Sequence, residues 1–309
     1  MAIVKQQGYF TSDNKRNRIR ALIWADEKVS PVGVVQLVPS FGDHVGRYDA
    51  FARFLAGEGF VVCGADHLGT GLSVPEDAAR GAVLPGEHIS MLRDMNTLHR
   101  LMMRRYPGLP VVMAGFGVGS FLARIYCRSF APLLAGALFV GTSQLPDWVA
   151  VFEDGAKRAL EALPPSVSAS AALPTVFGKL TRRLYKDDSE LSWLSSSETA
   201  LEAYLADPLT QYTQTGEMTA ELLTILIKGS RPVNCVGLPE GFPVMFLSGG
   251  KDSVGLFGRG VINASDLYMA AGVTPEVVIY PAMRHEILHE NEHDRVFADA
   301  LSFLKQCIS

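Results

Sequence analysis

Three glycines at alternate positions, Gly115, Gly117 and Gly119, mark a sharp turn in the middle of the chain. The first of them follows the apolar run V-V-M-A, and a helical pattern starts at Val118, directly after the second, so the sequence predicts a strand that runs directly into a helix. Glycine-rich turns of this kind also bind the phosphates of dinucleotides, but that chemistry requires the spacing G-x-G-x-x-G, and here the sixth position is Ser120. A tight strand–helix turn is therefore the simpler interpretation of the glycines themselves.

A second pattern that could do chemistry lies near the C-terminus. His285, Glu286 and His289 form the sequence H-E-x-x-H, and His293 follows. In zinc proteases this pattern places two histidines on one helix, with the glutamate as the base. Here the pattern directly follows a predicted strand at residues 276–280. We therefore interpret the match as a coincidence, and we expect neither a metal ion nor another cofactor.

The elements that must position these residues alternate between strands and helices. Short apolar runs rich in valine predict strands that are buried on both faces, at residues 33–38, 60–65, 109–114 and 135–140. Helical patterns separate or follow them at residues 48–55, 88–106 and 118–130. A hairpin formed by residues 8–11 and 19–25 precedes them. This alternation predicts a mostly parallel sheet with right-handed crossover connections.

The pattern changes after residue 142, where a long helical region begins that is interrupted by several prolines. Strand-like runs return at residues 243–247 and 276–280, and a last helix is expected near residues 292–306. We therefore predict one α/β core, formed by residues 1–142 and 231–309, and a helical cap formed by residues 143–230. A cap inserted at the carboxyl ends of the strands would cover the crevice in which open α/β sheets bind their ligands.

The composition excludes several classes of protein. The 309 residues carry a net charge of −4, which gives no support to a nucleic-acid partner. The four cysteines (Cys63, Cys127, Cys235 and Cys307) form no C-x-x-C pair, so neither a zinc ribbon nor a disulfide framework is indicated. The chain has no apolar run long enough to span a bilayer and no signal-peptide pattern, so we expect a cytoplasmic protein without stable membrane insertion. The basic residues 179–186 are compatible with peripheral contact with anionic membranes, although a solvated helix is the commoner interpretation.

Several further stretches share one pattern. They read L-V-P-S-F-G-D-H-V-G-R-Y from Leu37, V-V-C-G-A-D-H-L-G-T-G from Val61, L-S-G-G-K-D-S-V-G from Leu247 and Y-P-A-M-R-H-E-I-L-H-E from Tyr280. The predicted cap adds W-L-S at Trp193 and Y-x-x-D-P at Tyr204. Together these motifs resemble the lysophospholipase and monoacylglycerol lipase branch of the α/β-hydrolases, the serine aminopeptidase-like group. The resemblance covers nearly the whole chain and implies an α/β-hydrolase fold, with an eight-stranded sheet flanked by helices, and a small acyl ester or lipid-like molecule as the ligand.

The resemblance implies a role for each of five positions. It places the nucleophile at residue 117, the acid at Asp252 and the general base at His285, in the order that this fold uses along the chain. Asp252 would accept a hydrogen bond from one imidazole nitrogen of His285 and so fix its tautomer. The backbone N–H groups of Val118 and Phe41 would form the oxyanion hole.

The chain departs from the family pattern at the nucleophile itself. Gly117 stands where the family has serine, so this position offers no oxygen that could attack a carbonyl group. Loss of the nucleophile lowers the kcat of a serine protease by about a million-fold. The family's His-Gly pair on the oxyanion loop is Pro39-Ser40 here, and Thr70 stands where relatives often have histidine. We therefore expect a chain that folds, because glycine relieves the strain of the bend, but that is catalytically impaired.

Three hypotheses about function remain open at this point. The chain is an ester hydrolase framework whose serine has been replaced by Gly117, or a non-catalytic protein that binds a small acyl or apolar ligand in the cap pocket. The third hypothesis is hydrolysis through another hydroxyl group. Ser40 lies on the oxyanion loop near the crevice, whereas Ser120 lies one turn into the helix and is expected to face away from His285. The sequence does not indicate an oligomeric state.

Overall fold

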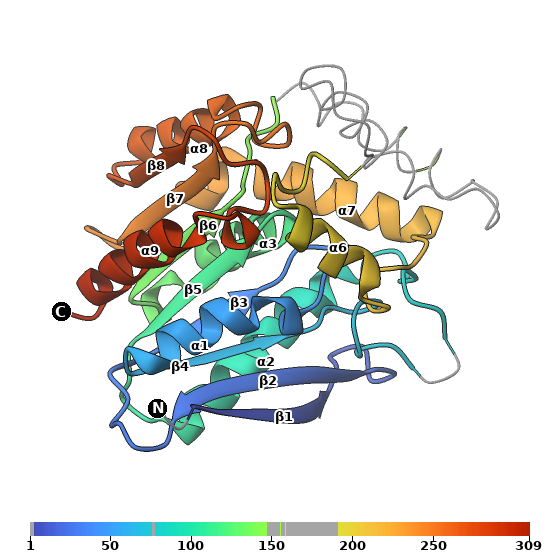
Figure 1. The fold of residues 1–309 in the computed structure, drawn as a ribbon, viewed down its shortest axis with the longest axis horizontal. Coiled ribbons are helices and arrows are strands. Elements are labelled where there is room, and N and C mark those ends of the chain that lie inside the picture. Colours follow the sequence, from blue (N-terminus) through green and yellow to red (C-terminus); the bar gives the residue numbers. More distant parts are fainter. Residues whose placement is uncertain (1–2, 76–77, 147–154, 156–157, 159–190) are drawn as a thin grey trace.

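The computed structural model describes residues 3–75, 78–146, 155, 158 and 191–309. These residues form one eight-stranded sheet in the order β1-β2-β4-β3-β5-β6-β7-β8 (Figure 1). The strands are β1 (Ile3–Thr11), β2 (Arg18–Asp26), β3 (Gly33–Val38), β4 (Phe60–Ala65), β5 (Val111–Phe116), β6 (Gly136–Val140), β7 (Val244–Gly249) and β8 (Glu276–Tyr280). The β1–β2 and β2–β4 pairs are antiparallel, and every later pair is parallel. The predicted α/β-hydrolase sheet is thus confirmed.

Helices cover both faces of this sheet (Figure 1). On one face lie α1 (Asp49–Gly57) and α9 (His293–Cys307), which pack on side chains such as Val35 and Leu37 of β3. The other face is covered by α2 (His88–Arg105), α3 (Val118–Phe130) and α8 (Arg259–Ala270), which pack with Val34 and Val38. Alternate residues of β3 therefore enter opposite cores, as the pleat of a strand buried on both faces requires.

Most element boundaries agree with the sequence patterns. The strands predicted at residues 33–38, 60–65 and 276–280 and the helix at 118–130 have these bounds. The strand expected at 109–114 instead spans Val111–Phe116, because Pro110 has no N–H for the ladder and Gly108 turns the chain with φ of 80°. The patterns did not predict α8.

Most of the described part of the predicted cap lies in residues 191–230. It contains α6 (Glu198–Ala206) and α7 (Gly216–Gly229), and α7 packs against α3. The basic residues 179–186 lie outside the described residues. No helix within the described ranges is both long and apolar enough to cross a membrane.

Candidate active site

The turn between β5 and α3 has the sharp bend that the three glycines predict. Gly117 adopts φ of 49° and ψ of −124°, and its N–H donates a hydrogen bond to the Val140 carbonyl oxygen at 2.9 Å. A side chain on Gly119 would overlap the carbonyl oxygens of Val38, the last residue of β3, and of Pro39, which follows it. Glycine is therefore required at residue 119 for the close approach of α3 to the loop that follows β3.

Two residues from the loops after β7 and β8, the predicted acid and base, form a hydrogen-bonded pair beside this turn. Nδ1 of His285 lies 3.0 Å from Oδ2 of Asp252, and Asp252 is fully buried. Burial lowers the pKa of His285, but the negative charge and hydrogen bond of Asp252 outweigh this effect, so the net pKa is raised above its ordinary value. A Cβ atom placed on Gly117 would lie 3.2 Å from Nε2 of His285. The predicted base is thus next to the space that a side chain on residue 117 would occupy.

A hydroxyl group from another loop already fills part of this space. A Cβ atom on Gly117 would overlap Oγ of Ser40 and would lie 3.0 Å from Cβ of Ser40. The backbone N–H of Val118 donates a hydrogen bond to Oγ of Ser40 at 3.2 Å. One of the two predicted oxyanion donors therefore already binds a serine side chain in this structure.

Ser120, the other candidate replacement, is placed differently. Its side chain is fully buried in the first turn of α3, and its hydroxyl donates to the Gly117 carbonyl oxygen at 2.5 Å. This hydroxyl is committed to the backbone of the turn.

The loop after β3 is held in place by side chains beneath it. The backbone N–H of Ser40 donates to the Tyr48 hydroxyl at 3.3 Å, and this hydroxyl donates to Asp43 at 2.8 Å. Nε2 of His67 lies 3.0 Å from the Pro39 carbonyl oxygen. Burial lowers the pKa of His67 to about 4, so the neutral ring donates this bond from its Nε2–H group.

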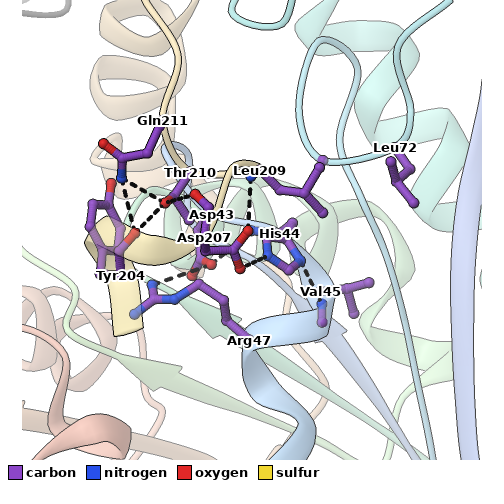
Figure 2. Close-up of polar contacts among 12 residues, drawn as sticks. Asp43, His44, Val45, Arg47, Leu72, Tyr204, Asp207, Leu209, Thr210 and Gln211 are labelled. Atoms are coloured by element: carbon purple, nitrogen blue, oxygen red, sulfur yellow. Dashed lines mark hydrogen bonds and ion pairs between the residues drawn. The ribbon is translucent and has the colours of Figure 1, made fainter. Parts of the chain in front are cut away.

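The segment formed by residues 191–215 forms hydrogen bonds with the same loop. The Tyr204 hydroxyl donates to the Gly42 carbonyl oxygen at 3.0 Å, and the Gly42 N–H donates to the Tyr212 hydroxyl at 3.1 Å. Figure 2 shows His44 facing Asp207, with Nε2 and Oδ2 separated by 2.8 Å. Nδ1 of His44 accepts a bond from a backbone N–H, so Nε2 carries the proton that Asp207 accepts. The N–H and the carbonyl oxygen of Gly42 are thus both held by hydrogen bonds to residues of this segment.

The loop that carries His285 is anchored in a similar way. Its neighbour Glu286 forms a two-pronged ion pair with Arg47 at 2.8 and 2.7 Å, and the charge of Arg47 lowers the pKa of Glu286 against the opposing effect of burial. The Glu286 N–H donates to the Leu194 carbonyl oxygen at 2.7 Å. The Trp193 ring lies 5.3 Å from the His285 ring, between centroids. The family-like W-L-S stretch therefore packs against the predicted base.

The H-E-x-x-H pattern does not form the helix that a zinc protease uses. His289 ends a short 3-10 turn (Ile287–His289), and α9 begins only at His293. His285 is paired with Asp252 and Glu286 with Arg47. In the described ranges, no three His, Cys, Asp or Glu side chains are grouped so as to hold a metal ion.

A cavity of about 200 Å³ opens in front of Gly117 and His285. Its walls come from the oxyanion loop, the turn after β5, the His285 loop and the 191–215 segment, and they include Phe41, Phe116, Trp193, Leu194, Tyr212 and Leu288. A cavity of about 150 Å³ is enough to bind benzene. This pocket therefore has room for a short acyl chain next to the acid–base pair.

Comparison with known proteins decides the family. Residues 29–292 match the family described as serine aminopeptidase, S33. The chain belongs to this family of α/β-hydrolases. The S33 chain is 25% identical to a monoacylglycerol lipase of Mycolicibacterium smegmatis, over 91% of each protein. It is 28% identical to the human monoglyceride lipase, over 58% of this chain and 53% of that protein.

A solved structure resembles the S33 chain over its full length. The carboxyl esterase from Bacillus coagulans, crystallised in complex with glycerol, superimposes with a TM-score of 0.89 and 26% identity, covering 100% of both chains. The predicted monoacylglycerol lipase-like α/β-hydrolase framework is thus confirmed.

In this S33 chain, the structure brings together all five predicted site positions. Gly117, Phe41 and His285 line one pocket, Asp252 supports His285, and Val118 begins the helix that leaves the turn. The sequence patterns did not assign roles to Arg47, Tyr204, Tyr212 or Trp193. The family-like stretches at Trp193 and Tyr204 were the signal for two of these residues, whereas nothing in the chain indicated the pairing of Arg47 with Glu286.

Proposed function

We propose that this chain is an ester hydrolase that binds a small carboxylic ester of the monoacylglycerol type in the pocket, and that it forms no acyl intermediate at position 117. One observation carries the proposal. His285, oriented by Asp252, directs Nε2 into the pocket at a residue that has no side chain. This arrangement supports an acid–base role for the two side chains, whereas position 117 has no side chain that could act as the nucleophile.

The relatives support the choice of ligand class. One of them is a monoacylglycerol lipase, and another is an esterase whose structure contains glycerol, the alcohol part of a monoacylglycerol. The pocket combines aromatic and aliphatic walls with the polar groups of the oxyanion loop and His285. This mixture suits a ligand that has an apolar chain and an ester group.

A purely ligand-binding role is the second candidate, and Gly117 is the observation that favours it. A protein of this kind would hold the ester without converting it. Formation of free fatty acid separates the two candidates, because a binding protein returns the ester intact.

Binding is tested with a ligand that cannot be hydrolysed. An ether analogue, 1-O-octylglycerol, is titrated by calorimetry and in thermal unfolding. We expect saturable binding and a higher melting temperature. Gln214 lines the pocket and is partly exposed, so Gln214→Trp should fill the pocket and abolish binding.

Gln306→Trp introduces the same side chain at an exposed position of α9 and serves as the matched control. It should bind the analogue as the unaltered chain does. Absence of binding to the unaltered chain, or equal binding by the Gln214→Trp variant, would contradict the proposed function.

A further inference from the structure

The hydroxyl group of Ser40 occupies the space in which the family's nucleophile would stand. Gly117 and Ser40 have exchanged side chains relative to the family pattern, since the family has serine at the first position and glycine at the second. In the structure, Ser40 Oγ overlaps the position of a Cβ atom built on Gly117. We propose that Ser40 is the nucleophile of this site. The proposal rests on the proposed function, because it needs an ester bound in the pocket.

His285 is placed to accept the proton of this hydroxyl. The Cβ position built on Gly117 is overlapped by Ser40 Oγ and lies 3.2 Å from Nε2 of His285, so both groups border the same small space. The Ser40 hydroxyl donates its proton to no acceptor among the described residues. The structure shows no direct hydrogen bond between the two side chains, but such bonds are often long before substrate binds and shorten in the Michaelis complex.

The start of α3 favours the anionic form of the Ser40 oxygen. The N–H of Val118, the first residue of this 13-residue helix, donates to Ser40 Oγ at 3.2 Å. A hydrogen bond to the deprotonated form and the positive end of a helix dipole both stabilise negative charge on this oxygen. The Asp252–His285 pair provides the base, and the helix terminus assists the nucleophile.

The chemistry then balances as in other serine hydrolases. Ser40 Oγ forms a bond to the carbonyl carbon of the ester while its proton moves to Nε2 of His285. The C–O bond to the alcohol breaks, and His285 returns the proton to the alcohol. Water then attacks the acyl-serine with His285 as the base, which releases the carboxylic acid and restores the Ser40 hydroxyl.

The two oxyanion donors keep their places but exchange roles. With Ser40 as the nucleophile, the N–H of the following residue is that of Phe41. The N–H from the neighbouring loop is that of Val118, which donates to Ser40 Oγ before the reaction and must transfer to the oxyanion as Oγ bonds to the carbonyl carbon. No described residue accepts a hydrogen bond from the Phe41 N–H, so this donor is available to the oxyanion. The reciprocal exchange at residues 40 and 117 thus leaves the remaining machinery usable.

A capping role is the competing explanation for Ser40, because a serine hydroxyl often accepts a bond from the first N–H groups of a helix. A cap would stabilise α3 without reacting with any electrophile. Covalent labelling therefore separates the two roles.

The test uses a fluorophosphonate probe on the full chain, followed by tryptic digestion and mass spectrometry. Ser40 lies in the peptide of residues 29–47, whereas Gly117 and Ser120 lie in the peptide of residues 106–124. We expect one phosphonyl adduct, located on Ser40. Ser40→Ala should reduce labelling and ester hydrolysis at least about 100-fold, whereas Ser129→Ala, at an exposed serine, should change neither.

The outcomes distinguish this inference from the proposed function. Binding of the ether analogue without any adduct on Ser40, or an adduct on another residue, would overturn the inference and leave ligand binding intact. Loss of ether binding would overturn the proposed function itself. Peptide mapping of the unaltered chain decides the result even if Ser40→Ala fails to fold.

Discussion

At the scale of single residues, the site depends on where one hydroxyl group lies. Gly117 keeps the backbone angles of the bend, φ 49° and ψ −124°, without a side chain, and Ser40 fills the vacated space from the neighbouring loop. Positive φ is costly for any residue other than glycine. The two positions are therefore coupled by both steric exclusion and chemistry.

Replacing Gly117 with serine alone should destabilise the protein. The new side chain must share space with Ser40 Oγ and adopt a φ of 49°, and together these effects should lower the free energy of unfolding by about 1–3 kcal/mol. Adding Ser40→Gly should recover part of this loss and give an active enzyme with its nucleophile at residue 117. Urea unfolding of the unaltered chain, both single variants and the double variant measures the coupling. Strictly additive changes would show that the two side chains do not compete.

The pH dependence of the site follows from His285. Its pKa is raised above the ordinary value of about 6.5, and only the neutral ring can accept a proton. The rate of ester hydrolysis should therefore fall as the pH decreases through the raised pKa. The pH at which the rate is half-maximal should lie above the ordinary pKa of histidine, about 6.5. Asp252→Asn removes the charge that raises this pKa, so the acid limb should move to lower pH and the maximal rate should fall. An unchanged acid limb in pH–rate profiles of both proteins would exclude His285 as the base.

The same shift has a consequence for stability. Because the folded pKa of His285 is raised, protonation of this ring stabilises the fold below the unfolded pKa, and this contribution is lost as the pH rises through the folded pKa.

At the scale of elements, the oxyanion loop depends on the 191–215 segment. Tyr212 accepts the Gly42 N–H and Tyr204 donates to the Gly42 carbonyl oxygen, so this segment fixes the peptide groups next to Phe41. His44 and Asp207 add a further link between the two segments (Figure 2). A loop that presents a backbone donor needs this support from side chains around it.

Removal of the Tyr212 hydroxyl should weaken this support. Tyr212→Phe leaves the partly buried Gly42 N–H without its acceptor, which should cost about 1 kcal/mol in stability and lower the hydrolysis rate about tenfold. Thermal unfolding and initial rates measure both effects. Tyr106→Phe removes a hydroxyl that forms no hydrogen bond with any described residue, so it is the matched control. Equal behaviour of the two variants would mean that the loop holds its shape unaided.

The elements of the core were predictable because their sequence patterns are local. A strand buried on both faces, such as β3 or β4, is a short valine-rich run bounded by turn residues. The positions of Asp252 and His285 followed from motifs that resemble the family. The contacts of Arg47 with Glu286 and of Tyr212 with Gly42 join residues that are far apart in sequence, so no local pattern indicates them.

The overlap between Ser40 and a side chain on residue 117 is likewise a contact that no local sequence pattern indicates. The sequence showed Pro39-Ser40 as a departure from the family and Gly117 as another, without indicating that the two positions meet. Their contact depends on the parallel pairing of β3 with β5, which brings the ends of both strands together.

At the scale of the whole molecule, the pocket joins segments that are distant in sequence. The loops after β3, β5 and β8 form one side, and the 191–215 segment forms the other. Figure 1 shows α6 and α7 beyond the strand ends on the side where these loops emerge. A ligand held between them should stabilise both sides at once.

Hydrogen exchange tests this coupling. Saturation with 1-O-octylglycerol should slow amide exchange in residues 37–48, 191–215 and 283–290 together, by up to about 100-fold at a ligand concentration of 100 times Kd. Gln306→Trp should behave in the same way, and Gln214→Trp should show no protection. Protection confined to the core loops would mean that the 191–215 segment does not contact the ligand.

The most direct test of the whole account is to trap the acyl intermediate. The unaltered chain is mixed with excess p-nitrophenyl butyrate, quenched with acid within its first turnover and digested with trypsin. We predict a butyryl group on Ser40, in the peptide of residues 29–47, and an unmodified peptide of residues 106–124. A butyryl group on Ser120, or p-nitrophenol release with Ser40 unmodified at every quench time, would contradict the claim that the hydroxyl of residue 40 has replaced the nucleophile at residue 117.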